Sequence, residues 1–67
     1  VQAPMPGLVL RVLTQVGAVV APGDPLIVLE SMKMENTLRA NGAGTVVEIP
    51  VQAGHAVEKG QLLVKFG

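Results

Sequence analysis

The chain has 67 residues, five basic and five acidic side chains, no cysteine and one aromatic residue, Phe66. This balanced charge offers no electrostatic footprint for nucleic acid or for an anionic membrane surface. The apolar runs are far shorter than a bilayer span, so no membrane contact is expected. The absence of disulfides fits a reducing compartment. The length allows one small domain with a core of aliphatic side chains.

Short valine-rich runs, separated by Gly, Pro, Asn and Asp, predict an all-β domain, a flattened barrel or sandwich of antiparallel strands. No stretch has the apolar spacing of a helix. After an extended piece near residues 2–5, strands are expected at about 8–13, 18–20, 26–30, 35–39, 45–51, 55–57 and 61–66.

The sequence contains an internal repeat, because residues 3–29 align with residues 40–66 without a gap. Two such copies are too few for a solenoid, so we expect them to pack face to face around a pseudo-twofold axis. Glycines recur as matched pairs, which we interpret as structural turn positions that permit a positive φ. These pairs are Gly7 and Gly44, Gly17 and Gly54, and Gly23 and Gly60.

Comparing the two copies predicts which residues face the core. Arg11 matches Glu48, and Val28 matches Lys65, so both of these positions are expected to face water. By strand alternation their neighbours then point inward. Val9 and Val46 are apolar but out of step with this alternation, which indicates a bulge or bend close to Gly7 and Gly44. The residues expected to point inward are Leu10, Val12, Ile27, Leu29, Val47, Ile49, Val64 and Phe66.

Lys33 lies at the junction of the two copies, where only Ser31–Met34 separate two expected strands. Such a short link predicts a tight hairpin with Lys33 in solvent. Because the symmetry mate of this link would begin near residue 67, we expect the hairpin at the end of the domain opposite the chain termini. Met32 and Met34 bracket the lysine, and exposed thioethers are adaptable contact groups on recognition surfaces. No neighbour would act as a base for the amine, so Lys33 is expected to be a substrate of another enzyme and not a catalyst.

The segment Glu30-Ser-Met-Lys-Met-Glu35 resembles the biotin-attachment motif of biotin carboxyl carrier domains, which is usually Ala-Met-Lys-Met. Ser31 replaces the usual alanine. The resemblance extends to Ala3-Pro-Met-Pro-Gly7, to Gly23-Asp-Pro-Leu26 and to the series of Gly54, Val57, Gly60 and Leu63, and thus covers nearly the whole chain. It implies that residues 1–67 form one carrier domain of two four-stranded antiparallel sheets with pseudo-twofold symmetry.

The resemblance also implies a function. Lys33 would carry covalent biotin attached by a biotin protein ligase, with Glu30, Ser31, Met32, Met34 and Glu35 as the recognition motif. The carrier would move carboxyl groups between a biotin carboxylase and a carboxyltransferase that acts on an acyl-CoA or a 2-oxo acid, in a carboxylase or decarboxylase. It would not be an enzyme by itself, and would work in the cytoplasm or the mitochondrial matrix.

Three other functions are considered. A lipoyl carrier domain shares the implied fold, but usually has Asp before and Ala after its lysine. A cofactor-free interaction domain would not need Lys33 at all. An autonomous enzyme or metal site has little support, because His55 is the one histidine and no cysteine accompanies it or the three methionines, Met5, Met32 and Met34.

Overall fold

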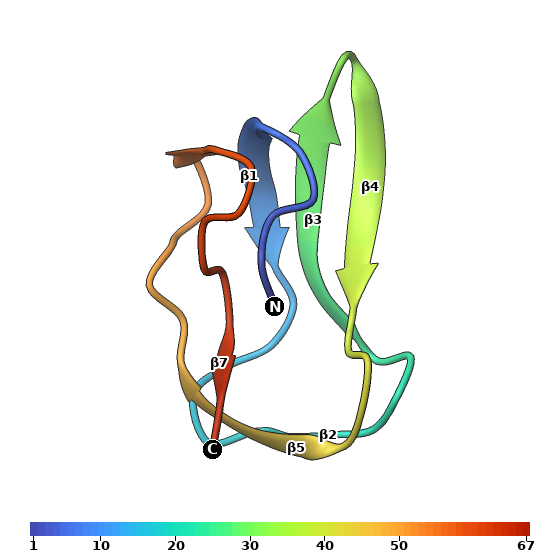
Figure 1. The fold of residues 1–67 in the computed structure, drawn as a ribbon, viewed down its shortest axis with the longest axis vertical. Coiled ribbons are helices and arrows are strands. Elements are labelled where there is room, and N and C mark those ends of the chain that lie inside the picture. The colour runs from blue at the N-terminus through green and yellow to red at the C-terminus, as the bar shows by residue number, and fades with distance from the viewer.

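The computed structural model describes all of residues 1–67 and consists of β-strands, turns and extended segments (Figure 1). It contains no helix that is long and apolar enough to cross a membrane. Because the chain forms seven strands and no helix, the all-β prediction is confirmed. The strands are β1 (Gly7–Val12), β2 (Val19–Val20), β3 (Pro25–Ser31), β4 (Met34–Arg39), β5 (Gly44–Glu48), β6 (Ala56–Val57) and β7 (Lys65–Phe66).

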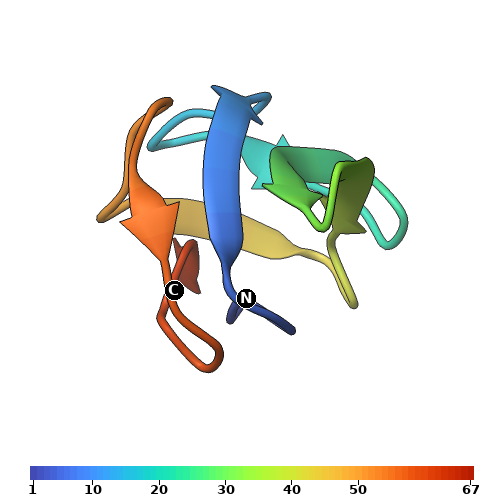
Figure 2. The same ribbon diagram turned by 90° about the horizontal axis from the view of Figure 1, so that it is seen from above.

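Two antiparallel sheets make up the fold: a four-stranded sheet with the order β4-β3-β1-β6 and a three-stranded sheet with the order β2-β5-β7. Seen from above, β1 lies between the β3–β4 hairpin and β6 (Figure 2). The second sheet has one strand fewer than expected. The N-terminal segment adds only a single bridge, between Gln2 and Leu62, and is too short there to count as a strand.

The two halves of the chain make corresponding pairings. In one sheet Gly7 faces Val57, and in the other Gly44 faces Val20, each partner being 37 positions away from its counterpart. The pairings of β1 with β3 and of β5 with β7 also correspond, including a register shift at the same place in each. The repeated sequence pattern thus goes with a repeated hydrogen-bonding pattern.

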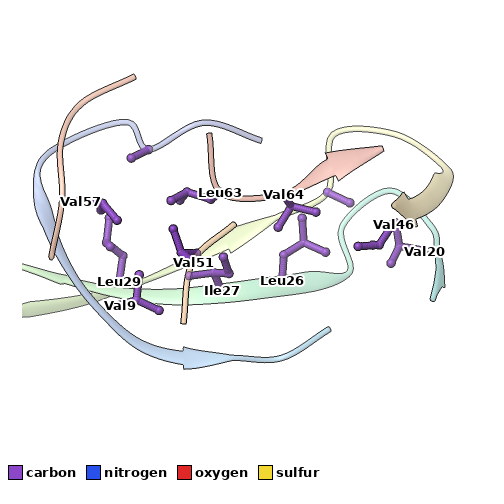
Figure 3. Close-up of a cluster of buried hydrophobic side chains, with 12 residues drawn as sticks. Val9, Val20, Leu26, Ile27, Leu29, Val46, Val51, Val57, Leu63 and Val64 are labelled. Atoms are coloured by element: carbon purple, nitrogen blue, oxygen red, sulfur yellow. The ribbon is translucent and has the colours of Figure 1, made fainter. Parts of the chain in front are cut away.

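The core is aliphatic and lies between the sheets. Side chains of β3 face those of the C-terminal segment, as Figure 3 shows for Leu26 and Ile27 opposite Leu63 and Val64. No polar side chain is buried. The twelve residues of the cluster are Ala3, Val9, Val20, Leu26, Ile27, Leu29, Ala40, Val46, Val51, Val57, Leu63 and Val64.

The predicted bulges are present, and they change which residues point inward. The register shifts between Val9 and Arg11, and again between Val46 and Glu48. Val9 and Val46 are buried, as expected. The prediction was wrong for Val47, whose exposed fraction is 45%, because the extra residue of a bulge leaves the alternation of the strand.

Val28 is a second correction, because only 3% of it is exposed although it was expected to face water. It lies on the central strand β3 between its cross-strand partners, Arg11 on β1 and Thr37 on β4. The Arg11 guanidinium reaches Glu35 on β4, so its side chain crosses β3 to do so. The aliphatic part of an arginine covers apolar surface well, which accounts for the burial of Val28.

The glycine prediction is correct for four of the six positions. Gly17, Gly23, Gly54 and Gly60 have φ values of 92°, 88°, 93° and 86° in turns. Gly7 and Gly44 are instead the first residues of β1 and β5, without a positive φ. At Gly7 the requirement is space, since an added Cβ would lie 2.4 Å from the carbonyl oxygen of Glu30.

The chain ends were expected opposite the β3–β4 hairpin, and this is correct for the C-terminus alone. Along the longest axis of the molecule, which measures 30 Å, the C-terminus lies at the far end from the hairpin (Figure 1). The N-terminus lies about midway, because its ammonium group donates a hydrogen bond of 2.6 Å to the carbonyl of Val64.

Candidate functional site

The β3–β4 hairpin is the longest regular element of the domain. Its ladder runs from the pair Pro25 and Arg39 to the pair Ser31 and Met34, so that only Met32 and Lys33 form the loop. Two-residue loops are favoured in antiparallel hairpins when both residues have a positive φ, because this backbone twist matches the twist of the strands. Met32 and Lys33 have φ values of 53° and 65°, as a type I′ turn requires.

This turn is built from residues that do not favour it. Type I′ turns prefer Asn and Gly, whereas a left-handed conformation costs other L-residues roughly 1–2 kcal/mol each. Met32 and Lys33 are the only non-glycine residues of the chain with a positive φ. The regular ladder beneath the turn imposes this conformation, and with it the direction in which the Lys33 side chain leaves the backbone.

The tip of the hairpin is exposed. It rises above the rest of the molecule (Figure 1), and 91% of Met32 and 66% of Met34 are open to solvent. The ammonium group of Lys33 forms no hydrogen bond and no ion pair, since the one salt bridge of the chain joins Arg11 to Glu35. A primary amine and two thioethers are therefore presented together to any partner that approaches this end.

Just below its turn, the hairpin is fixed against the start of β1. The Ser31 hydroxyl donates a hydrogen bond of 2.8 Å to the carbonyl of Pro6. Gly7, the next residue, lies against the Glu30 carbonyl so closely that a Cβ has no room. On the outer face of the sheet Arg11 reaches Glu35 at 3.5 Å, an ion pair that is well exposed to solvent.

The surroundings of Lys33 are a convex, exposed part of the hairpin. No pocket is formed, and no cluster of His, Asp or Glu side chains could hold a metal ion. His55 lies in an exposed turn, where its Nδ1 accepts a hydrogen bond of 3.3 Å from the amide of Gln52. The group of this arrangement that could react is the Lys33 amine, which is exposed and has no hydrogen-bond or ion-pair partner.

All residues of the predicted recognition motif, Glu30 to Glu35, lie on this hairpin. The sequence reasoning did not identify Pro6, Gly7 and Arg11 as parts of the same structural unit. The segment Ala3–Gly7 was noted as an extended piece, as part of a resemblance and for its glycine, and Arg11 was noted as a water-facing residue, but neither was linked to the hairpin. These residues lie near the hairpin because β1 pairs with β3. The register of that pairing shifts at the bulge, so their partners on β3 could not be found by counting positions along the sequence.

Comparison with known proteins assigns this chain to a family. Residues 1–66 match the biotin and lipoyl attachment family described as "Biotin-requiring enzyme", and the chain belongs to this family. Among curated proteins, the biotin carboxyl carrier protein of Streptococcus mutans serotype c is 50% identical over 62 residues. The alignment covers 92% of this chain and 48% of the relative, so the chain spans about half the length of that protein. In type, the chain is a biotin carboxyl carrier domain.

Solved structures agree with this assignment. A single-chain, multi-domain long-chain acyl-CoA carboxylase contains a region with a TM-score of 0.90 and 36% identity, covering 96% of this chain and 6% of that one. The lipoyl domain of the 2-oxoglutarate dehydrogenase complex from Azotobacter vinelandii has a TM-score of 0.81 and 26% identity, over 92% of this chain and 78% of that one. The two kinds of carrier share the fold, and the carboxylase is the more similar of these two.

Proposed function

We propose that Lys33 is the residue on which this carrier domain holds biotin, in an amide bond between the cofactor's carboxyl group and Nζ. A biotin protein ligase would form this bond. The loaded domain would then visit a biotin carboxylase, where the cofactor accepts a carboxyl group, and a carboxyltransferase, where that group passes to an acyl-CoA or a 2-oxo acid. The working compartment would be the cytoplasm, or the mitochondrial matrix in a eukaryote.

The observation that supports this proposal best is the position of the Lys33 amine. It lies at the tip of a hairpin that extends beyond the rest of the domain, on a backbone with a left-handed conformation and without an ion pair. Lys59 and Lys65, the other two lysines, lie respectively in a turn next to β6 and in β7, away from this tip. Only Lys33 has thioethers on both sides.

Within this mechanism the domain itself would bind, orient and carry. Met32 and Met34 would contact the ligase and the two carboxylase sites through their exposed, polarizable side chains. The rigid ladder of β3 and β4 would fix the point from which the lysine side chain and its cofactor extend. Attachment keeps the cofactor at a high effective concentration near both sites, so that it does not have to dissociate between them.

The experiment that tests the proposal is a loading reaction. The chain is incubated with biotin, ATP and a biotin protein ligase, and the product is located by peptide mass spectrometry. We expect one biotinoyl group, on Lys33, and none on the Lys33→Arg variant, which keeps the positive charge. Lys59→Arg and Lys65→Arg serve as matched controls and should load like the parent. An unmodified Lys33 in the parent, with the domain folded, would refute the proposal.

A lipoyl carrier is the second candidate, favoured by the similarity to the lipoyl domain described above. The same reaction with lipoate and a lipoate ligase separates the two. Biotin transfer without lipoate transfer supports the biotin carrier, and the reverse result supports the lipoyl carrier. If neither transfer occurs and Lys33→Ala has no effect in cells, the domain acts as a cofactor-free interaction module.

A further inference from the structure

Ser31 is the residue at which the hairpin of this chain departs from the usual attachment motif, and the structure gives its hydroxyl a partner. Ser31 is the last residue of β3 and pairs with Met34 across the two-residue turn. Its hydroxyl donates a hydrogen bond of 2.8 Å to the carbonyl of Pro6, which lies 25 residues away in the sequence. An alanine at this position has no atom that could make this bond.

The contact is made where the hairpin leaves the body of the domain. Next to Pro6, the backbone of Gly7 packs against the Glu30 carbonyl without room for a Cβ, and Leu8 pairs with Glu30 across the strands. Beyond the pair of Ser31 and Met34, the hairpin contains only the turn residues Met32 and Lys33. The hydrogen bond from Ser31 to Pro6 is thus the side-chain hydrogen bond to the rest of the domain that lies nearest the turn, at the point about which the tip could bend.

We propose that Ser31 is a positioning residue, whose hydroxyl holds the tip of the hairpin at a fixed angle on the domain. The fixed tip would strengthen the binding of a biotin protein ligase to the hairpin around Lys33. This inference rests on the proposed function. A hairpin that is already held in its bound orientation loses less conformational freedom when it docks. The left-handed conformations of Met32 and Lys33 make this important, because the strain of the turn favours fraying of the last strand pair, which the Ser31 hydroxyl opposes.

The first test measures the hairpin without any partner. Amide hydrogen exchange is followed in the parent, in Ser31→Ala and in Ser31→Thr, which keeps the hydroxyl and is well suited to a strand. We expect the Met34 amide to exchange about fivefold faster in Ser31→Ala, as the loss of a hydrogen bond worth about 1 kcal/mol would give. Ser31→Thr should exchange like the parent. Thr45→Ala is the control, since it removes an exposed hydroxyl without a hydrogen bond from the other sheet.

The second test measures ligase kinetics on the same proteins. We expect Ser31→Ala to raise the KM of the carrier about three- to fivefold, with kcat unchanged, because the reacting amine is the same once it is bound. Ser31→Thr should restore the parent KM, and Thr45→Ala should leave both constants unaltered. A residue with a purely structural role would lower the melting temperature of Ser31→Ala without separating KM from kcat.

The outcomes of these tests are distinct from failure of the proposed function. If the parent takes up no biotin at Lys33, the proposed function itself is wrong, whatever Ser31 does to exchange. If the parent is loaded, but Ser31→Ala matches it in both exchange rate and KM, the inference about Ser31 is overturned and the attachment site stands. Faster exchange with an unchanged KM also overturns it, because the hydroxyl would then stiffen a hairpin whose stiffness the ligase does not use.

Discussion

At the scale of single residues, glycine is required in this chain for two different reasons, a positive φ and a lack of space for a side chain. Gly17 and its equivalents occupy turns with a positive φ, which a pattern of Gly, Pro and Asp predicts well. Gly7 has no such conformation and is required by the closeness of the Glu30 carbonyl. The sequence shows that a glycine recurs at both kinds of position. It does not show which requirement applies, because the second depends on a neighbouring strand.

Gly7→Ala should destabilise the domain by about 1–3 kcal/mol, the usual effect of forcing extra volume into a packed site. The new Cβ would lie 2.4 Å from a backbone oxygen, which cannot move away without distorting β3. Urea denaturation followed by circular dichroism measures the change. Gly42→Ala is the matched control, because its Cβ would meet nothing within 4 Å, and its stability should remain within about 0.5 kcal/mol of the parent. Equal stabilities of the two variants would contradict the close packing at Gly7.

Arg11 should matter more for what it covers than for its charge. Its ion pair with Glu35 is exposed at both ends, with 62% and 61% of the side chains open to solvent, and such pairs contribute little. We expect Glu35→Gln to change the free energy of unfolding by less than about 0.5 kcal/mol, and Arg11→Ala to cost more because Val28 is uncovered. Arg11→Met, which keeps an unbranched apolar chain, should recover most of that loss in the same denaturation measurement. A larger loss from Glu35→Gln than from Arg11→Ala would show that the charge dominates.

At the scale of elements, the hairpin was predictable because its signal is local. Strand-like residues on both sides of a link as short as Ser31–Met34 leave no other connection. The left-handed conformations of Met32 and Lys33 were not predicted, since neither residue favours them. They follow from the register of the two strands, which only the complete ladder determines. The burial of Val28 escaped prediction for a similar reason, because it depends on a side chain from the neighbouring strand β1.

Met32→Asn should stabilise the domain, by roughly 0.5–1 kcal/mol, because Asn adopts a positive φ at the first position of a type I′ turn more readily than Met does. Only 9% of the Met32 surface is covered, so little packing is lost. The rise in melting temperature is measured calorimetrically. Met34→Asn provides the control, since Met34 lies in β4 without a positive φ and Asn is poorly suited to a strand. A similar gain from both variants would argue against relief of turn strain.

At the scale of the whole molecule, most of the correct predictions about packing followed from the internal repeat. Aligning residues 3–29 with 40–66 led to two packed halves and to the buried positions Ile27 and Leu29. The three-stranded second sheet was not foreseen, because the N-terminal segment pairs through Gln2 alone. The repeat predicts where strands lie, but the number of backbone hydrogen bonds at an edge depends on details of the chain path that the alignment does not contain.

Leu29→Ala should cost about 2–5 kcal/mol, as removal of a fully buried leucine usually does. Leu29 is 0% exposed and belongs to the cluster between the two sheets. In a domain of this size such a loss removes much of the stability, which thermal denaturation would reveal as partial or complete unfolding at 37 °C. Leu13→Ala makes the same chemical change where 47% of the side chain is exposed, and should cost distinctly less. If both variants melt together, the core is not where the structure has it.

The six residue pairs between β3 and β4 have one more consequence, for the freedom of this site to vary. Side chains along a strand alternate between its faces, so pairing β4 with β3 one residue out of register would turn β4 over and bring its charged groups to the interior. The spacing of the hairpin is therefore locked by the interior of the protein. A lysine exchanged with Met32 or Met34 would extend from the backbone in a different direction, and a methionine would occupy position 33.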